Sequence, residues 1–459
     1  MSFAALDSAL LGPLFATETM CAVFSDEARL AALLRTEAAL ARAQAAIGLV
    51  PPSLAPAIER IGPDAFDMDD LGERTAISGV PIIPFVKALQ SKLPDDLEPF
   101  LHKGATTQDI ADTGLMLQLR EGLDLVAADI RVVLDALARL ARRHRDTPCA
   151  GRTYGQHAAP ITFGFKAAIW AAGIADLASA LPYIRQRICV ASLAGPVGTL
   201  TALGERGPEV LTGFAEELGL GAPSVSWHVR RARLVETGTW LATLLGALAK
   251  MAADVVHLSS TEVGEVAEPH IAGRGGSSAM PHKRNPVSST VILAAHAAAK
   301  GHVITLLDAM AAQHERPAGL WHAEWHALPP LFGLASGALR EAIAIATGLT
   351  VDAERMRSNL DLTRGLLFAD AAASRLSERL GREAAHALVE RAAERVRAKG
   401  ISLGEALRAM TEFPDTTDLD AAFDLTSAIR SAGLWTSNAL ADLERLQASA
   451  EIGATSACP

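Results

Sequence analysis

A chain of 459 residues exceeds the size at which one hydrophobic core usually stops growing, so we expect two or three domains. Its net charge of −10, without a block of basic residues, argues against a nucleic-acid surface. Half of the residues are apolar and only 5% are aromatic. Because Ala and Leu dominate the apolar fraction and favour helices, the composition predicts an all-α fold packed on small side chains.

The cysteines and the N-terminus indicate the compartment. Cys21, Cys149, Cys189 and Cys458 are scattered without the spacing of a zinc site or a disulfide framework. The N-terminus lacks the basic region of a signal peptide, and no charge-free apolar stretch of about 18 residues occurs. We therefore expect a soluble, cytoplasmic protein.

Apolar residues recur at helical spacing in long segments. The first covers residues 25–50 and stops at Gly48 and the Pro51-Pro52 pair. The second covers residues 109–145 and predicts a helix of roughly 50 Å at 1.5 Å per residue.

Two further long segments, residues 233–268 and 287–313, contain no internal proline. Within residues 240–256 apolar side chains cover nearly every face, which indicates a helix buried on all sides and favours a bundle shared between subunits. From about residue 350 the predicted helices are shorter and more charged. No strand alternation of any length is visible.

Residues 273–286, GRGGSSAMPHKRNP, form the least helix-like stretch in this frame. Three glycines among its first four residues allow backbone N–H groups to converge on an anion or a developing oxyanion. Two serines, two cations and an asparagine follow, and Pro286 suits the start of the next helix. An ordinary glycine-rich loop with solvated charges is the plainer interpretation. The concentration of hydroxyls, cations and an amide favours a functional flap.

GSSAMPHKRNP, residues 276–286, resembles the signature of the fumarase/aspartase superfamily. Two more segments match this superfamily in order, HKGATTQDI at residues 102–110 and GRTYGQHAAP at residues 151–160. The resemblance therefore spans most of the chain.

Later segments are similar to the carboxymuconate cycloisomerase branch of that superfamily. They are QHER at residues 313–316, GLWHAEW at residues 319–325 and NLDLTRGL at residues 359–366. The Ser-Ser-Ala-Glu-Arg pattern usual in adenylosuccinate lyases is absent.

The resemblance implies a three-domain, mainly α-helical subunit. We expect an N-terminal helical domain at residues 1–108, a central long-helix bundle with the flap and the tetramer core at 109–349, and a small C-terminal helical domain at 350–459. The resemblance also implies a homotetramer in which three subunits contribute to each active site. The activity it implies is an intramolecular lyase, a cycloisomerase that lactonises 3-carboxy-cis,cis-muconate to 4-carboxymuconolactone in the β-ketoadipate degradation of aromatic compounds, with no cofactor and no metal.

The resemblance also implies roles for single residues. Ser277 takes the position of the catalytic serine, and Lys283 and the flap N–H groups would stabilise its alkoxide. The flap backbone is contributed by Gly275, Gly276, Ser278 and Met280. The residues expected to bind the tricarboxylate substrate are Thr106, Thr107, Arg152, Gln156, His157, Asn285 and Arg316.

Structural roles remain open for several of these residues. Thr106 and Thr107 can cap the helix that starts near Asp109, and either arginine can be an ion-pair partner. His157 can simply pack and hydrogen-bond in a turn.

Tyr154 stands where lyase members commonly carry a histidine that assists at the opposite face of the substrate. Its presence is consistent with a cycloisomerase, which has no separate leaving group to protonate. The alternatives are an adenylosuccinate lyase-type enzyme, a cycloisomerase for a 3-sulfo analogue, a non-catalytic structural member of the superfamily and a helical scaffold. His322 and His326 lie four residues apart, but Ala323 occupies the position of the glutamate in a zinc-binding HExxH motif, so we expect no metal there.

Overall fold

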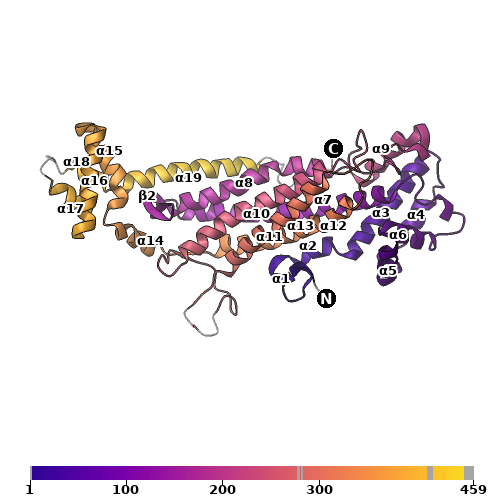
Figure 1. The fold of residues 1–459 in the computed structure, drawn as a ribbon, viewed down its shortest axis with the longest axis horizontal. Helices are drawn as coiled ribbons and strands as arrows, with labels where there is room; N and C mark the ends of the chain where they lie inside the picture. Colours follow the sequence, from indigo (N-terminus) through magenta and orange to yellow (C-terminus); the bar gives the residue numbers. More distant parts are fainter. Residues whose placement is uncertain (1–2, 277–279, 281–282, 411–416, 449–459) are drawn as a thin grey trace.

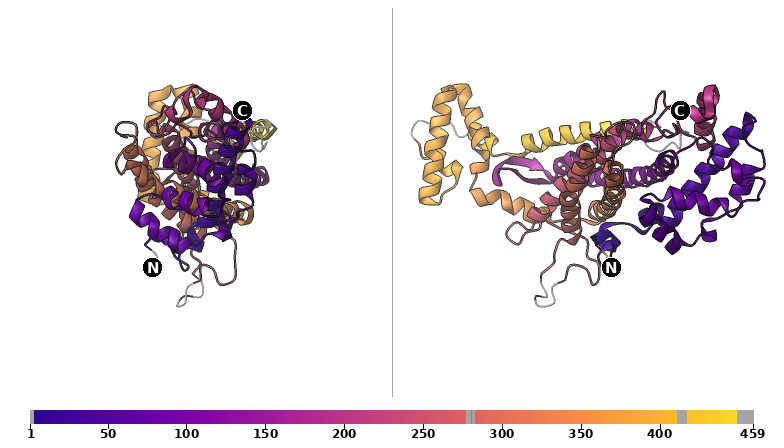
Figure 2. Two further views of the ribbon diagram at one scale, coloured as in Figure 1. Left: turned by 90° about the vertical axis from the view of Figure 1, so that its right-hand side faces the viewer. Right: turned by 45° about the vertical axis from the view of Figure 1, so that its right-hand side comes forward.

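The computed structural model describes residues 3–276, 280, 283–410 and 417–448, and they form an elongated molecule of packed helices (Figure 1). A group of N-terminal helices lies at one end, long helices form the middle, and a small C-terminal group lies at the other end (Figure 2). The all-α prediction is confirmed.

The N-terminal group contains one longer helix, α3, which packs against α4, α7 (Thr107–Arg143) and α9 (Gly207–Leu218). Its helices are α1 (Gly12–Phe15), α2 (Glu18–Val23), α3 (Asp26–Ala46), α4 (Leu54–Glu59), α5 (Met68–Ser78) and α6 (Ile82–Gln90).

The central bundle consists of long helices that pack side by side, joined by shorter ones. The long helices are α7 (Thr107–Arg143), α8 (Phe163–Ile188), α10 (Ala232–Leu258), α11 (Val287–Ala309) and α13 (Leu328–Gly348), and the shorter ones are α9 (Gly207–Leu218) and α12 (Leu320–Trp325).

Four C-terminal helices have their own hydrophobic core, separate from the large core shared by the N-terminal helices and the bundle. They are α15 (Ala369–Leu380), α16 (Arg382–Lys399), α17 (Leu403–Arg408) and α18 (Thr417–Ala422), whereas Met356 of the preceding α14 (Ala353–Leu360) joins the large core. The last helix, α19 (Leu425–Ala448), returns along α8, and its Leu440 and Leu443 join the large core.

The limits of the first long helices follow from local chemistry. Ser25 caps α3, because its Oγ accepts a hydrogen bond from the Ala28 N–H at 3.1 Å, and α3 ends just before Gly48, whose φ is 76°. α7 runs without a proline until the chain reaches Pro148. Both helices lie within a few residues of the predicted limits.

Three helices, α8, α10 and α11, are long and apolar enough to span a membrane by length and composition. In the fold they pack against one another or against neighbouring helices of the bundle. These helices are not equally buried. In the most apolar stretch of α11 only 28% is buried, and Ile304, Leu307 and Met310 lie exposed. α11 thus presents an apolar face outside the chain's own core.

The structure contains short strands, although no strand alternation is visible in the sequence. β1 (Pro148–Thr153) and β2 (Gln156–Thr162) form an antiparallel hairpin, and β3 (Val266–Ala267) pairs with β4 (Thr350–Val351). The hairpin turns at Tyr154 and Gly155, both with positive φ, and a bulge interrupts its register at Gly151 and Arg152. A tyrosine in the left-handed region is an uncommon turn residue, so the usual Asn-Gly signal of such hairpins is missing.

The cysteines differ in state. Cys21 and Cys149 are free, and burial raises the pKa of the Cys149 thiol to about 12, so it stays protonated. Cys189 is disulfide-bonded, which the scattered spacing of the cysteines did not indicate.

Candidate active site

A buried carboxylate fixes the start of α7. Asp109 accepts hydrogen bonds from the backbone N–H groups of Thr106, Ala194 and Gly195, each at 2.9 Å, and lies 2.6 Å from Nε2 of His228. Asp109 and His228 are both almost completely buried. Since these partners satisfy both oxygens of the buried carboxylate, the loop at residues 194–195 is held against the first turn of the helix.

Arg316 joins this end of α7. Its Nη2 donates to Oγ1 of Thr106 at 3.0 Å and to the carbonyl of Pro196 at 3.4 Å. The helix start adds its own unpaired N–H groups and positive dipole end next to the hydroxyls of Thr106 and Thr107. The structure therefore brings three of the predicted binding residues together as a potential carboxylate site, with Thr106 also serving as N-cap of α7.

The loop that faces this site was not identified from the sequence. Residues 191–200 pass beside the start of α7, where the Ser192 N–H donates to Thr113 Oγ1 and Thr113 Oγ1 donates to the Ser192 carbonyl. Gly195 and Gly198 adopt positive φ. The GPVG sequence at residues 195–198 is the signal that could have revealed this second glycine-rich segment.

A buried ion network supports the same end of the bundle. Arg231 donates to both oxygens of Asp112 and of Glu324, and the indole of Trp321 donates to Asp112 at 3.1 Å. Burial lowers the pKa of Arg231, but the two carboxylates outweigh it and raise that pKa above its ordinary value. This network links α7, α10 and α12 and holds the chain that follows Arg316.

The β1–β2 hairpin carries the second group of predicted residues. Arg152 forms a bidentate ion pair with Glu265 at 2.6 and 3.1 Å, and the amide of Asn359 donates to the same carboxylate at 2.8 Å. Arg152 is thus ion-paired within its own chain. Gln156 is exposed, and burial together with the charge of Arg152 lowers the pKa of His157, so its imidazole is neutral at neutral pH.

Backbone pairing joins the two ends of the flap. The Asn285 N–H donates to the Gly275 carbonyl at 2.9 Å, and Gly276 pairs with Arg284 in an antiparallel bridge. Gly275 has a φ of 71°, and a Cβ there would lie 2.7 Å from the Asn285 carbonyl oxygen, so only glycine fits this position.

Lys283 and Asn285 are exposed and line a pocket of about 230 Å³ with Gly276, Arg274 and Glu268. The predicted flap residue Met280 is also exposed. Ser277 and Ser278 lie outside the described residues.

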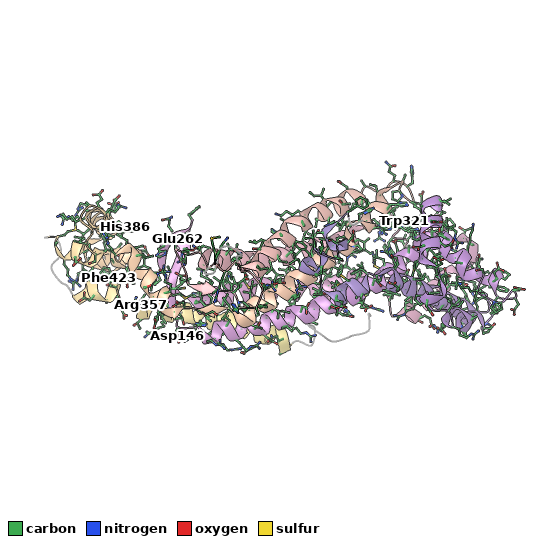
Figure 3. The ribbon with its side chains drawn as sticks, turned by 90° about the horizontal axis from the view of Figure 1, so that it is seen from below. Asp146, Glu262, Trp321, Arg357, His386 and Phe423 are labelled. Atoms are coloured by element: carbon green, nitrogen blue, oxygen red, sulfur yellow. The ribbon has the colours of Figure 1, made fainter. Side chains whose placement is uncertain are left out.

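The predicted site residues lie at two ends of the chain's own bundle. Trp321, whose indole contacts the first turns of α7, is near one end in Figure 3, and Asp146, which follows α7, and Glu262 are near the other. α7 has 37 residues, so about 55 Å separate Thr106 from the hairpin. Within one chain, the Thr106 and Arg316 site does not meet the hairpin.

Comparison with known proteins identifies the relatives of this fold. A family model described as lyase matches residues 15–301, and one described as adenylosuccinate lyase C-terminus matches residues 365–439. The chain belongs to the fumarase/aspartase lyase family.

Individual relatives cover nearly the whole chain. A 3-carboxy-cis,cis-muconate cycloisomerase of Pseudomonas aeruginosa is 46% identical over 93% of this chain and 95% of its own length. A nitrosuccinate lyase of Streptomyces davaonensis is 43% identical over 89% of each. The crystal structure of the 3-carboxy-cis,cis-muconate lactonizing enzyme from Pseudomonas putida matches with a TM-score of 0.91 and 42% identity, covering 96% of this chain and all of that one.

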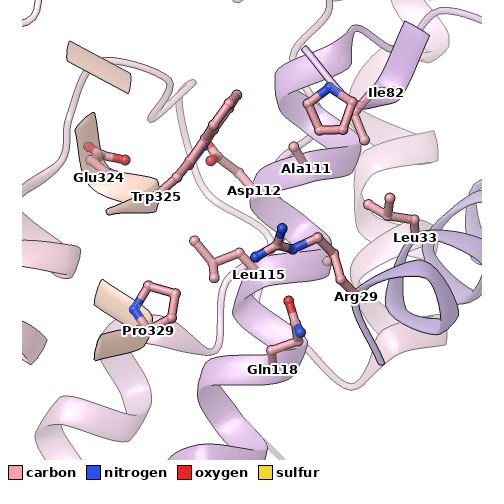
Figure 4. Close-up of a pocket in the computed structure, with 12 residues that line it drawn as sticks. Arg29, Leu33, Ile82, Ala111, Asp112, Leu115, Gln118, Glu324, Trp325 and Pro329 are labelled. Atoms are coloured by element: carbon pink, nitrogen blue, oxygen red, sulfur yellow. The ribbon is translucent and has the colours of Figure 1, made fainter. Parts of the chain in front are cut away.

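A small pocket of about 70 Å³ lies near the Arg231 network. Figure 4 shows apolar side chains such as Leu33, Ile82 and Leu115 on its walls, together with Asp112 and Glu324 of the network.

His322 of α12 contacts groups of its own chain. His322 Nε2 lies 3.0 Å from the Gly79 carbonyl, and its ring packs against Trp325. Across the described part of the chain, no group of three or more histidine, cysteine, aspartate or glutamate side chains could hold a metal ion.

We predict that Asp109→Asn destabilises the folded chain by about 2–4 kcal/mol, because an amide would turn a donor toward buried N–H groups that need an acceptor. Thermal unfolding followed by circular dichroism measures the effect. Asp129→Asn is the matched control on the same helix: burial alone raises the pKa of Asp129, which shows that its charged form gains nothing from the fold, so this change is expected to be neutral or slightly stabilising. Equal destabilisation by both changes would contradict the role given to Asp109.

Proposed function

We propose that this chain is a 3-carboxy-cis,cis-muconate cycloisomerase that closes its substrate to 4-carboxymuconolactone. The observation that carries the proposal is the 46% identity with the Pseudomonas aeruginosa cycloisomerase over nearly the full length of both chains. The TM-score of 0.91 with the lactonizing enzyme of Pseudomonas putida supports it. Cationic and hydroxyl groups at the flap and at the start of α7 suit a substrate with three carboxylates.

In the proposed mechanism, one carboxylate of the substrate attacks the ring-closing carbon of its own conjugated diene. The tether positions this nucleophile, so neither a metal nor a cofactor is needed. Negative charge then develops on another carboxylate, where Lys283 and the flap N–H groups of Gly275 and Gly276 would stabilise it. Ser277 delivers a proton to the adjacent carbon and completes the lactone.

The other predicted site residues are given either a substrate-binding or a positioning role, according to their contacts in the structure. Thr106, Thr107 and Arg316 are proposed to hold one carboxylate, because Arg316 already contacts Thr106. Asn285 is proposed to bind another from the flap, with Gln156 and His157 contributed by the hairpin. Arg152 is proposed to orient the hairpin through Glu265 rather than to bind the substrate directly.

A second candidate is an eliminating lyase, favoured by the 43% identity with the nitrosuccinate lyase. Such an enzyme would release nitrite from nitrosuccinate. The two activities are separable, because one consumes a conjugated diene and the other liberates a small anion.

The direct test is an ultraviolet assay of the purified protein with 3-carboxy-cis,cis-muconate in the presence of EDTA. We expect loss of the diene absorbance at a rate that the chelator does not change. Release of nitrite from nitrosuccinate without turnover of the muconate would replace the cycloisomerase by the eliminating lyase. Turnover that disappears with EDTA and returns with a divalent ion would refute the metal-free mechanism.

Replacement of Ser277 by alanine is predicted to lower kcat by about 10²–10⁴, the usual contribution of a positioned acid or base. KM is expected to change little, because the proposed carboxylate contacts do not include this hydroxyl. Ser278→Ala is the neighbouring control and is expected to cost less. A larger effect at Ser278 would reassign the proton transfer, and wild-type rates in both variants would reject the flap mechanism.

We further propose that the protein is a cytoplasmic homotetramer with active sites shared between subunits. Two observations support the shared site: the exposed apolar face of α11 and the length of α7 between Thr106 and the hairpin. Packing the α11 faces of several copies together would bury Ile304, Leu307 and Met310.

Sedimentation equilibrium at micromolar concentration is predicted to give four times the 48.1 kDa chain mass. Leu307→Arg, which places a charge on the exposed apolar face of α11, is expected to shift the protein toward smaller species. Ile77→Arg on α5, another exposed apolar position, is the control and should leave the mass unchanged. A wild-type monomer under these conditions would overturn the shared-site proposal.

A further inference from the structure

A polar pocket lies where α8 ends and α10 begins. Its volume is about 390 Å³, and it is lined by Tyr183, Gln186 and Arg187 of α8, by Val190 and Gly221, and by Arg233 of α10, with disulfide-bonded Cys189 in the wall. None of these residues belongs to the predicted active site, so the pocket needs its own explanation.

Arg233 is the unusual member of this pocket. Its side chain is 6% exposed, yet its guanidinium makes one hydrogen bond, from Nη1 to the Arg187 carbonyl at 3.0 Å, and packs over the ring of Trp227 at 4.7 Å. Its Nε is buried without a hydrogen-bond partner. A guanidinium offers five N–H donors, and a buried charge of this kind ordinarily has an anionic partner.

The charges around Arg233 do not supply that partner. Arg187 is paired with Glu236 at 2.5 Å, and the carboxylates near Arg231 are engaged by Arg231 itself. Burial, followed by repulsion from Arg187, Arg230 and Arg231, lowers the pKa of Arg233 to about 10, with Glu236 opposing the shift. The guanidinium therefore stays charged at neutral pH and leaves the pocket positive.

We infer that this pocket binds a small oxyanion, a phosphate or a carboxylate group, with Arg233 as its principal ligand. The amide of Gln186 at the pocket wall is a neutral hydrogen-bonding group suited to the remaining oxygens, and the Tyr183 hydroxyl, which makes only a long hydrogen bond of 3.5 Å to Glu236, can turn to the same anion. The positive charge of Arg233 and the absence of an ion pair to it in the described chain select an anion over a neutral or cationic ligand.

The pocket is connected to the loop beside α7. The indole of Trp227, on which Arg233 packs, donates to the Ala191 carbonyl at 2.8 Å, and residue 191 begins the loop that contacts Thr113 and Arg316. An anion that fixes Arg233 would therefore also stabilise this loop.

The test uses isothermal titration of the full-length protein with inorganic phosphate and, separately, with succinate, at constant ionic strength set by chloride. Saturable binding of either probe is expected. Gln186→Glu places a negative charge at the exposed pocket wall and is expected to weaken that binding by at least about tenfold through like-charge repulsion. Ser179→Glu, an exposed position two turns earlier on α8, adds the same charge away from the pocket and should bind as the wild type does.

The contrast between these two variants separates the pocket from anion binding elsewhere, because any contribution of the active site is common to both. If Arg233→Met folds, it should abolish the binding of the anion. If it does not fold, the comparison of Gln186→Glu with Ser179→Glu decides the test. Binding of phosphate alone or of succinate alone assigns the anion class within the proposal. Equal binding by Gln186→Glu and Ser179→Glu, or no saturable binding of either probe by the wild type, would overturn it.

Discussion

The length of α7 constrains how this molecule can work. The helix carries Thr106 at its start and leads into the β1–β2 hairpin at its end, and 37 residues of α-helix keep the two about 55 Å apart. A long helix packed along its length against α8 and α13 does not fold back on itself. Any reaction that uses both the Thr106 and Arg316 site and the hairpin therefore needs more than one copy of the chain. For this reason the proposed catalytic unit is an oligomer.

Buried carboxylates organise both ends of this helix in comparable ways. At the start, Asp109 gathers backbone N–H groups and His228; at the far end, Glu265 gathers Arg152 and Asn359. Removing one member of such a cluster leaves a buried charge or donor unsatisfied, which costs more than the pair contributes when intact. The proposed substrate-binding residues at both ends of α7 are thus held by buried carboxylate clusters. The flap, in contrast, contributes its cations from an exposed loop.

Much of the fold could be predicted from the sequence because its signals are local. Apolar spacing, the Ser25 cap and the Gly48 stop define α3, and the proline-free run before Pro148 defines α7. The hairpin was missed because its turn is made by Tyr154 in a left-handed conformation, and its bulge breaks the alternation. The contact between Thr106 and Arg316 agrees with the residue types expected to bind a carboxylate.

The partners of the site residues could not be predicted, because they come from distant parts of the chain. Glu265 lies 113 positions from Arg152, and His228 lies 119 positions from Asp109. No periodicity links residues so far apart, so the carboxylate that pairs with Arg152 could be found only from the fold. The same holds for Arg233, whose sequence context gives no hint that it is buried without a carboxylate.

The shared active site is tested most directly by mixing two inactive variants, Lys283→Met in the flap and Arg316→Gln beside α7, and assaying 3-carboxy-cis,cis-muconate after subunit exchange. If the two residues enter each site from different subunits, random hybrids of equal amounts regain about one quarter of the wild-type activity, since each residue is intact in half of the positions. If both residues act from the same subunit, no hybrid site contains both. Hybrids that form, as shown by mass spectrometry, but stay inactive would contradict the account in which the flap and the start of α7 enter each site from different subunits.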